Sequence, residues 1–179
     1  MSNKKILITG GAGFIGSNLS LFLLEKGYEI TVLDNLSEQI HGSNPEEKSP
    51  LYNSIKNQVN FIKGTVTDRD DWQKAIGENE IIVHFAAETG TGQSMYQISH
   101  YTDVNIGGTA LMLDILANTK TSVKRVVVAS SRAIYGEGKY YLPELGNVYP
   151  EHRTAEEMDK GNFEVTYPGA LSPLQLLAT

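Results

Sequence analysis

The stretch SSRAIYGEGK, residues 130–139, places Tyr135 four positions before Lys139 and begins with two serines. A tyrosine can remove a proton from an alcohol only if its pKa, about 10 when unperturbed, is lowered. A nearby lysine ammonium lowers it, and a serine hydroxyl can bridge the tyrosine and the alcohol. These residue types would suit the oxidation of an alcohol, in which a proton leaves the oxygen while a hydride leaves the carbon.

That chemistry requires a helix, because a tyrosine and a lysine four positions apart face one site only when they lie one helical turn apart. Gly136 and Gly138 make this segment a poor helix former. A second match, Tyr52 and Lys56, lies in a polar segment far from Ser131 in the sequence. We expect neither pair to be catalytic, and both spacings are interpreted as coincidental.

A glycine-rich turn follows the first apolar run. The segment ITGGAGFIG carries Gly10, Gly13 and Gly16, and apolar residues recur at helical spacing from Phe14. After a strand and before a helix, such glycines make a tight turn, admit a pyrophosphate and let the helix pack closely. The N–H groups of Phe14 and Ile15 would face the anion. The loop predicts dinucleotide binding, whether the pattern is taken to begin at Gly10 or at Gly11. The alternative is a turn that binds nothing.

An acidic residue follows at the distance that ribose recognition requires. Asp34 ends the second apolar run, 18 residues after Gly16, where a carboxylate can accept hydrogen bonds from the adenosine ribose. It would repel the extra phosphate of NADP, and no Lys or Arg follows before Lys48. The sequence therefore favours NAD as the cofactor; the alternative is that Asp34 is only a turn residue at a strand end.

Short apolar runs alternate with helical patterns over the first two-thirds of the chain. Such alternation implies parallel strands with right-handed crossovers, an α/β fold with a Rossmann-like, doubly wound parallel sheet. Residues 36–58 interrupt it as a polar surface excursion with a short helix at its end, and 136–179 are mostly loop with a short helix within 153–160. The strands are expected within 4–10, 28–34, 59–63, 80–87 and 124–130, and the helices from residue 14 to a stop at Gly27, over 70–76 and over 101–118.

Bulk composition narrows the class of partner. The 179 residues carry a net charge of -6, contain no cysteine and no Lys/Arg block, and show no apolar run of membrane-spanning length. This argues against nucleic acid and membrane partners, and we expect a cytoplasmic protein with a small-molecule ligand. The four histidines lack metal-ligand spacing, so no metal is expected, and His84 is interpreted as a core residue.

Five motifs carry a resemblance to one family. They are TGGAGFIG (9–16), DN (34–35), VHFAA (83–87), VNIGGT (104–109) and SSRAIYG (130–136). In order and spacing they resemble the extended short-chain dehydrogenase/reductases, the NAD-dependent epimerases and dehydratases of nucleotide sugars. Within that family, residues 84–109 are similar to the 4-epimerases, including enzymes that act on dTDP-6-deoxyhexoses.

The resemblance implies roles for particular residues, with Ser131 as the catalytic serine. One departure lies after the third strand, where the family commonly has an aspartate that binds the adenine amino group and this chain has Thr65. The implied cofactor-binding residues are Gly10, Gly13, Phe14, Ile15 and Gly16 at the pyrophosphate, Asp34 and Asn35 at the ribose, Thr65 at the adenine, Val66 after it, Ala86 and Ala87 lining the cofactor by backbone, Thr89 near the nicotinamide, and Asn105 on the following helix.

The activity that the resemblance implies is epimerisation of a nucleotide-diphosphate sugar, with 4-epimerisation as the leading hypothesis. The sugar would be oxidised transiently and the hydride returned to its other face. Arg132 and Ala133 stand where family dehydratases have an Asp-Glu pair, which disfavours dehydration. An NADP-dependent reductase and a non-catalytic or vestigial NAD-binding protein are the alternatives.

The family's Tyr-x-x-x-Lys helix, sixth strand and substrate region are not recognisable after Ser131. We therefore expect an NAD-binding domain at residues 1–136, a sheet truncated after its fifth strand, and a loop-rich segment at 137–179 that leads toward a missing catalytic helix. The chain alone would be inactive. Complete family members would form homodimers.

Overall fold

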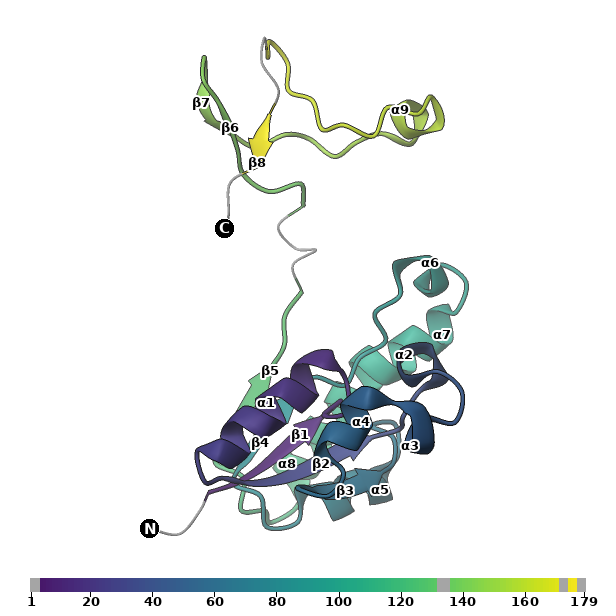
Figure 1. Cartoon of the computed structure of the whole chain (residues 1–179), viewed down its shortest axis with the longest axis vertical. Helices are drawn as coiled ribbons and strands as arrows, with labels where there is room; N and C mark the ends of the chain where they lie inside the picture. Colours follow the sequence, from purple (N-terminus) through teal and green to yellow (C-terminus); the bar gives the residue numbers. More distant parts are fainter. Residues whose placement is uncertain (1–3, 132–135, 171–173, 177–179) are drawn as a thin grey trace. The chain divides into compact units, whose positions relative to one another are not determined.

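The computed structural model describes residues 4–131, 136–170 and 174–176 (Figure 1). The chain divides into two compact units, Met1–Ala129 and Ser130–Thr179. The first unit holds the parallel sheet and its covering helices, and the second holds a small antiparallel sheet. Across the part of the chain that the structure describes, every helix is too short or too polar to cross a lipid bilayer.

The sheet of the first unit has five strands in the order β3-β2-β1-β4-β5, and all its neighbours pair in parallel. This confirms the predicted Rossmann-like, doubly wound α/β fold. The strand order reverses beside β1, so the loops after β1 and β4 flank the crevice where such sheets bind ligands. The strands are β1 (Lys5–Thr9), β2 (Glu29–Asp34), β3 (Asn60–Lys63), β4 (Ile81–His84) and β5 (Arg125–Val128).

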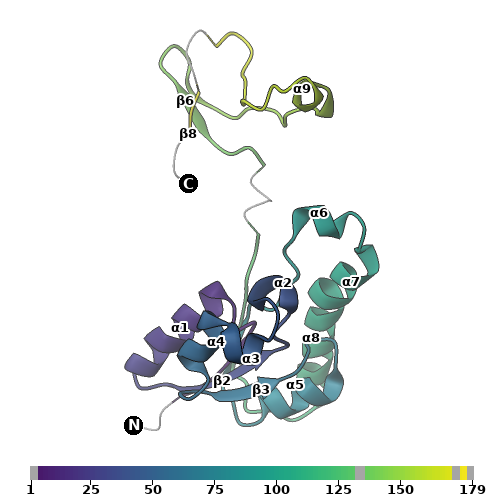
Figure 2. The same cartoon turned by 45° about the vertical axis from the view of Figure 1, so that its right-hand side comes forward.

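Helices cover both faces of this sheet, because alternate residues of its strands point to opposite sides. Leu7 enters a buried cluster with Trp72 and Met112, whereas Ile6 and Ile8 enter a second cluster on the other face. Figure 2 shows the helices of the two clusters on opposite sides of the sheet. They are α1 (Phe14–Glu25) and α4 (Pro50–Ile55) on one face, and α5 (Arg69–Ile76) and α8 (Gly108–Asn118) on the other.

Three of these helices bear out the sequence patterns, and one of them, α5, contains the whole predicted range 70–76. The helix from Phe14 ends before Gly27, whose φ of +81° stops it as expected. The helix predicted over 101–118 is observed as three helical segments that follow one another directly: α7 (Ile98–Thr102), the π-helical turn η1 (Asp103–Gly107) and α8. The π-helical turn was not predicted; such turns are frequent at functional sites.

The excursion between β2 and β3 is more ordered than the sequence indicated. It forms α2 (Glu38–His41), α3 (Pro45–Lys48) and α4, where one short helix was expected. Ser49 caps α4 by accepting the N–H of Tyr52 at 3.3 Å, and Ile55 is fully buried against the sheet. The first two helices are one turn long, too short for a hydrophobic period to reveal them.

The second unit contains β6 (Tyr140–Leu142), β7 (Gly146–Val148), β8 (Gln175–Leu176) and the short helix α9 (Ala155–Asp159). The helix confirms the prediction within 153–160. The expectation of loop was wrong for the hairpin of β6 and β7, which buries Leu142 and Val148. Strands of three residues are too short to show an alternating pattern.

Trp72 is expected to contribute strongly to the stability of the first unit. Its side chain is fully buried, and its indole N–H donates to the carbonyl of Val66 at 2.7 Å. Trp72→Phe would remove that bond and leave a cavity, lowering the free energy of unfolding by about 1–3 kcal/mol. Because Trp72 is the only tryptophan, the variant cannot be followed by tryptophan fluorescence, and circular dichroism melting measures the loss. A melting temperature equal to that of the parent protein would contradict this assignment.

Candidate functional site

The turn between β1 and α1 accepts only glycine at two positions. Gly10 has a φ of +65°, and a Cβ atom there would lie 2.8 Å from the backbone nitrogen of Ala86. A Cβ atom on Gly16 would lie 2.6 Å from the Cα of Gly11 and closer still to the carbonyl oxygen of Gly10. The loop is therefore closely packed between β1, the segment after β4 and the first turn of α1.

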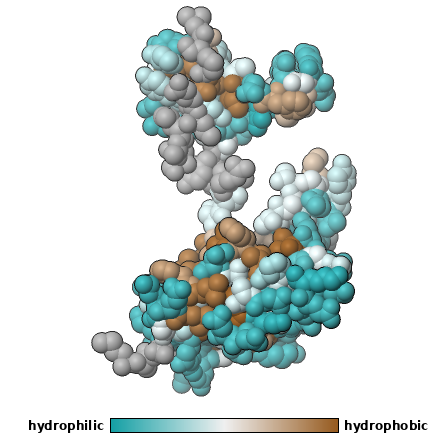
Figure 3. All heavy atoms as spheres, viewed as in Figure 1, coloured by the Kyte–Doolittle hydropathy of each residue, from teal (hydrophilic) through white to brown (hydrophobic). Residues whose placement is uncertain are grey.

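The amino end of α1 is open to an anion. No side chain caps it among the described residues, and the N–H of Ser17 is the first to bond back, to Gly13 at 2.9 Å. The N–H groups of Phe14 and Ile15 are thus left for a ligand, as at other helix amino termini. Both side chains are exposed, 74% and 65%, and Figure 3 shows apolar surface on the face of the first unit that carries α1.

Asp34 at the end of β2 is buried and holds two backbone segments. Its Oδ2 accepts the N–H of Ala12 at 2.9 Å, and its Oδ1 accepts the N–H of Leu36 at 2.8 Å. The first bond ties β2 to the glycine turn. Because each carboxylate oxygen has two lone pairs, Asp34 retains acceptor capacity for a ribose hydroxyl.

A pocket of about 460 Å³ lies at the carboxyl edge of the sheet, and the residues lining it include Asn35, Thr65, Thr67, His100 and Asp103. It brings together two residues that the sequence placed at the ribose and the adenine. The hydroxyl of Thr65 contacts that of Thr67 at 2.9 Å and accepts the N–H of Thr67 at 3.3 Å.

Val66, the predicted cofactor residue that follows Thr65, has a side chain that packs in the hydrophobic core. A contact with a nucleotide would have to come from its backbone.

Asn105 fixes the segment that follows β4. Its side-chain oxygen accepts the N–H of Glu88 at 2.8 Å, and its side-chain nitrogen donates to the carbonyl of Glu88 at 3.0 Å. The Glu88 carboxylate also lies 3.2 Å from His100. The two neighbours of Glu88, Ala87 and Thr89, are exposed. Asn105 therefore holds this loop in place, and its predicted role toward the cofactor stays a prediction.

His84 is buried and fully hydrogen-bonded, which confirms its interpretation as a core residue. Thr109 donates its hydroxyl hydrogen to the carbonyl of Asn105 at 2.9 Å and therefore accepts from Nε2 of His84 at 3.1 Å. Nδ1 then accepts from Thr9 at 2.7 Å, and the Thr9 oxygen accepts the N–H of Ala86 at 3.2 Å. This chain links the ends of β1 and β4 to α8 and assigns the neutral Nε2–H tautomer.

We expect the stability of the first unit to fall in mild acid because of His84. Burial lowers the pKa of His84 below its usual 6.5. The unfolded chain therefore binds the proton at a higher pH than the folded protein does. The free energy of unfolding, fully present above about 6.5, decreases as pH falls through that value toward the lower folded pKa. Urea unfolding followed by Trp72 fluorescence between pH 8 and 5.5 measures the slope.

The control for this pH effect is His84→Gln, since the three other histidines are present in both proteins. Its unfolding free energy should depend less on pH over the same range. An identical slope in the two proteins would assign the titration to another group.

Comparison with known proteins places this geometry in a family. Residues 6–156 match the NAD dependent epimerase/dehydratase family. The chain is 35% identical over 171 residues to the dTDP-L-rhamnose 4-epimerase of Burkholderia thailandensis, covering 94% of this chain and 45% of that protein. The chain belongs to the NAD-dependent epimerase/dehydratase family. This confirms the resemblance that the five motifs indicated.

Other relatives of this epimerase/dehydratase chain act on UDP-sugars. The UDP-glucose 4-epimerase of Neisseria meningitidis serogroup C is 32% identical over 155 residues, covering 85% of this chain and 43% of that protein. The structure of UDP-glucose 4-epimerase from Bifidobacterium longum in complex with NAD+ and UDP aligns with a TM-score of 0.61 and 29% identity, over 74% of this chain and 38% of that one. The chain spans less than half the length of these relatives.

The predicted catalytic serine of this family member belongs to the second unit, and the predicted cofactor residues belong to the first. Ser131 is an exposed residue of the second unit, and its catalytic role stays a prediction. Tyr135 lies outside the described residues, and Lys139 is not helical. In the other match, the ammonium of Lys56 lies 5.7 Å from the ring centroid of Tyr52. That contact is a cation–π pair on the surface of a short helix, which accords with a coincidental spacing.

Two acidic or basic side chains beside the site were missed from the sequence. Asp71 accepts the N–H of Thr65 at 3.0 Å and so holds the turn after β3. Its position three residues after Asp68, the N-cap of α5, is a capping pattern that could have revealed it. His41 contacts Asp34 from α2, and no local pattern predicts that contact.

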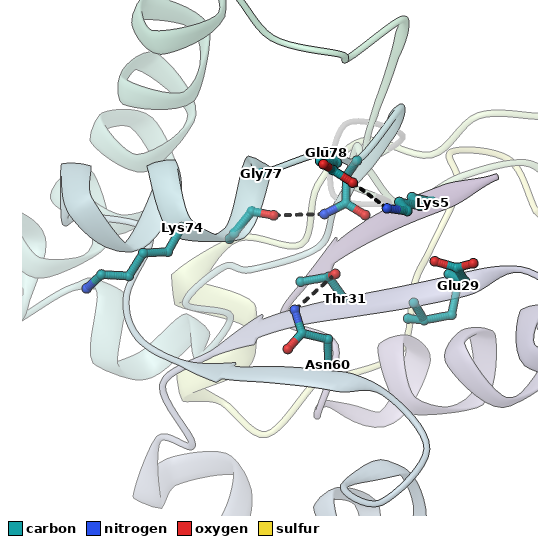
Figure 4. A pocket seen from close by; sticks show the side chains of 10 residues that line it. Lys5, Glu29, Thr31, Asn60, Lys74, Gly77 and Glu78 are labelled. Atoms are coloured by element: carbon teal, nitrogen blue, oxygen red, sulfur yellow. Dashed lines mark hydrogen bonds and ion pairs between the residues drawn. The ribbon is translucent and has the colours of Figure 1, made fainter. Parts of the chain in front are cut away.

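A second pocket, of about 280 Å³, lies at the opposite edge of the sheet and contains none of the predicted site residues. Figure 4 shows that Lys5, Glu29 and Asn60, which begin β1, β2 and β3, line it. Two pairs of its polar side chains contact each other, Lys5 with Glu78 at 2.5 Å and Asn60 with Thr31 at 3.5 Å. Since parallel sheets bind ligands at the carboxyl ends of their strands, we assign the functional site to the other edge.

Proposed function

We propose that the first unit binds NAD at the carboxyl edge of its sheet, and that the chain is the cofactor-binding portion of a nucleotide-sugar 4-epimerase. The observation that carries the proposal is the turn at Gly10 and Gly16, where a side chain would strike backbone, joined to Asp34 through the N–H of Ala12. A tight anion-binding turn tied to a ribose-binding carboxylate suits a dinucleotide.

Each part of the edge would hold one part of NAD. The open N–H groups of Phe14 and Ile15 would bind the pyrophosphate, and Asp34 with Asn35 the adenosine ribose. The pocket lined by Thr65 and Thr67 would take the adenine. Ala86, Ala87 and Thr89 would border the nicotinamide half, on a loop whose position Asn105 holds. NAD supplies the hydride acceptor and donor that a 4-epimerase needs to invert one carbon of its sugar.

The substrate class follows from the relatives. The curated relatives above are named for 4-epimerisation of dTDP-L-rhamnose and of UDP-glucose, so their substrates share a nucleoside diphosphate linked to a hexose. We infer a nucleotide-diphosphate sugar for the complete protein, and a dTDP-6-deoxyhexose in particular because of the 94% coverage and 35% identity with the rhamnose enzyme. Ser131 would contact the reacting hydroxyl.

The isolated chain is expected to bind NAD without turning over sugar nucleotides. Proton removal needs a tyrosine and a lysine on one helix beside the nicotinamide. Lys139 is not helical, and the Tyr52 ring, on α4 with Lys56 at its end, packs against Phe61 and the hydrophobic core. A homodimer and a domain boundary at residue 136 also stay predictions, as part of the proposed family architecture.

Titration calorimetry of the 179-residue chain with NAD and with NADP tests the proposal. We expect NAD to bind and NADP to bind at least about tenfold more weakly, because its added phosphate would approach the Asp34 carboxylate. No binding of either nucleotide would overturn the assignment of the site. A preference for NADP would favour the reductase instead.

A further inference from the structure

We infer that His41 is a positioning residue for Asp34 and thereby helps the site to recognise the 2′-hydroxyl of the adenosine ribose. The inference rests on the proposed binding of NAD. His41 belongs to the excursion between β2 and β3, which none of the motifs covers. It ends α2, and its side chain is only 2% exposed although most of the helix is at the surface.

Both ring nitrogens of His41 have partners from other segments. Nδ1 lies 2.8 Å from the hydroxyl of Ser49, the N-cap residue of α4. Nε2 lies 3.8 Å from Oδ1 of Asp34, whose side chain is 7% exposed. The histidine therefore bridges the start of α4 and the carboxyl end of β2.

The contacts of Ser49 are compatible with a ring proton that faces Asp34. The Ser49 oxygen already accepts the N–H of Tyr52 at 3.3 Å, so its own hydrogen can be donated to Nδ1 of His41. In the neutral ring the remaining proton is then on Nε2, which faces Asp34. At 3.8 Å this contact is electrostatic and is too long for a hydrogen bond.

The contacts with His41 and with two backbone N–H groups fix the orientation of the Asp34 carboxylate. Its Oδ2 is held by Ala12, and its Oδ1 is held by Leu36 and faces the positive edge of the His41 ring. A buried carboxylate is costly unless polar N–H groups surround it, and the Nε2–H of the neutral ring adds a third to the backbone N–H groups of Ala12 and Leu36. With these directions occupied, the remaining lone pairs are oriented for the ribose hydroxyls.

Two substitutions test the roles of the two ring nitrogens of His41 separately. His41→Gln places a side-chain N–H near the position of Nε2, and His41→Asn keeps a polar group near Nδ1 but cannot reach Asp34. We expect His41→Gln to bind NAD within about twofold of the parent protein, and His41→Asn about fivefold more weakly, a loss typical of one modest polar interaction. Calorimetry measures both affinities, and circular dichroism melting reports on the fold.

A second ligand separates positioning from a general structural effect. NAD that lacks the 2′-hydroxyl on its adenosine ribose should bind the parent protein more weakly than NAD does. Its affinity for His41→Asn should equal its affinity for the parent protein. In the Asp34→Asn background, His41→Asn should have no further effect on NAD, since the residue through which it acts has changed. Equal losses for the two ligands, or equal losses in the Gln and Asn variants, would overturn the inference.

The same measurements distinguish this inference from the proposed function. If the parent protein does not bind NAD, the proposed function fails and the role of His41 falls with it. If the parent protein binds NAD but His41→Asn weakens both ligands alike, only the role of His41 fails.

Discussion

Gly16→Ala is expected to bring NAD affinity below detection. The new Cβ atom would lie 2.6 Å from the Cα of Gly11 and closer to the carbonyl oxygen of Gly10, both backbone atoms of the turn that would bind the pyrophosphate. Backbone cannot yield as the end of a flexible side chain can, so the turn or α1 must move. We expect the free energy of unfolding to fall by about 1–3 kcal/mol as well. Calorimetry with NAD and thermal melting measure the two effects.

The matched control is Gly92→Ala in α6 (Thr91–Ser94). A Cβ atom there would meet nothing within 4 Å. Since alanine favours a helix over glycine, this variant should melt at the same or a slightly higher temperature and keep its NAD affinity. Full NAD binding by Gly16→Ala would mean that the nucleotide does not use the turn between β1 and α1.

Asp34→Asn is expected to weaken NAD binding by about ten- to a hundredfold, because hydrogen bonds to a charged group contribute about 1.5–3 kcal/mol. NADP should lose less, since the repulsion of its added phosphate is removed with the charge. The amide can still accept one of the N–H groups of Ala12 and Leu36, but its NH2 group must face the other. A loss of unfolding free energy of about 1–3 kcal/mol should therefore accompany the change in binding.

The control for Asp34→Asn is Glu38→Gln, which removes the same charge from an exposed position at the start of α2. We expect it to change neither the affinity for NAD nor the melting temperature appreciably. If Asp34→Asn melted earlier but bound NAD as tightly as the parent protein, Asp34 would be a structural residue of the turn alone.

Much of the first unit could be predicted because its signals are local. Runs such as residues 5–9 and 29–34 are apolar enough to be buried on both faces, and the glycines at 10, 13 and 16 come directly between a strand and a helix. Asp34 could be named as a candidate because the distance from the glycine turn to the end of β2 is set by one helix and one strand.

The parts that could not be predicted depend on partners far apart in the sequence or on very short elements. The one-turn helices α2 and α3 and the hairpin of β6 and β7 have too few residues for a period to appear. Asp34 was expected to contact the ribose of the cofactor, and the structure shows that it also binds the backbone N–H of Ala12, 22 residues away in the sequence. Nothing in the local sequence around His41 shows that its ring meets Asp34.

By itself, therefore, the sequence determined the fold class, the family and the turn at Gly10–Gly16, because hydrophobic period and glycine spacing act within one strand–turn–helix unit. Only the tertiary structure decided which polar groups meet: Asp34 with Ala12 and His41, Asn105 with Glu88, and His84 with two threonines. Those contacts arise where the carboxyl ends of parallel strands converge. Which side chains face one another there is set by the packing of the helices and the excursion over the sheet.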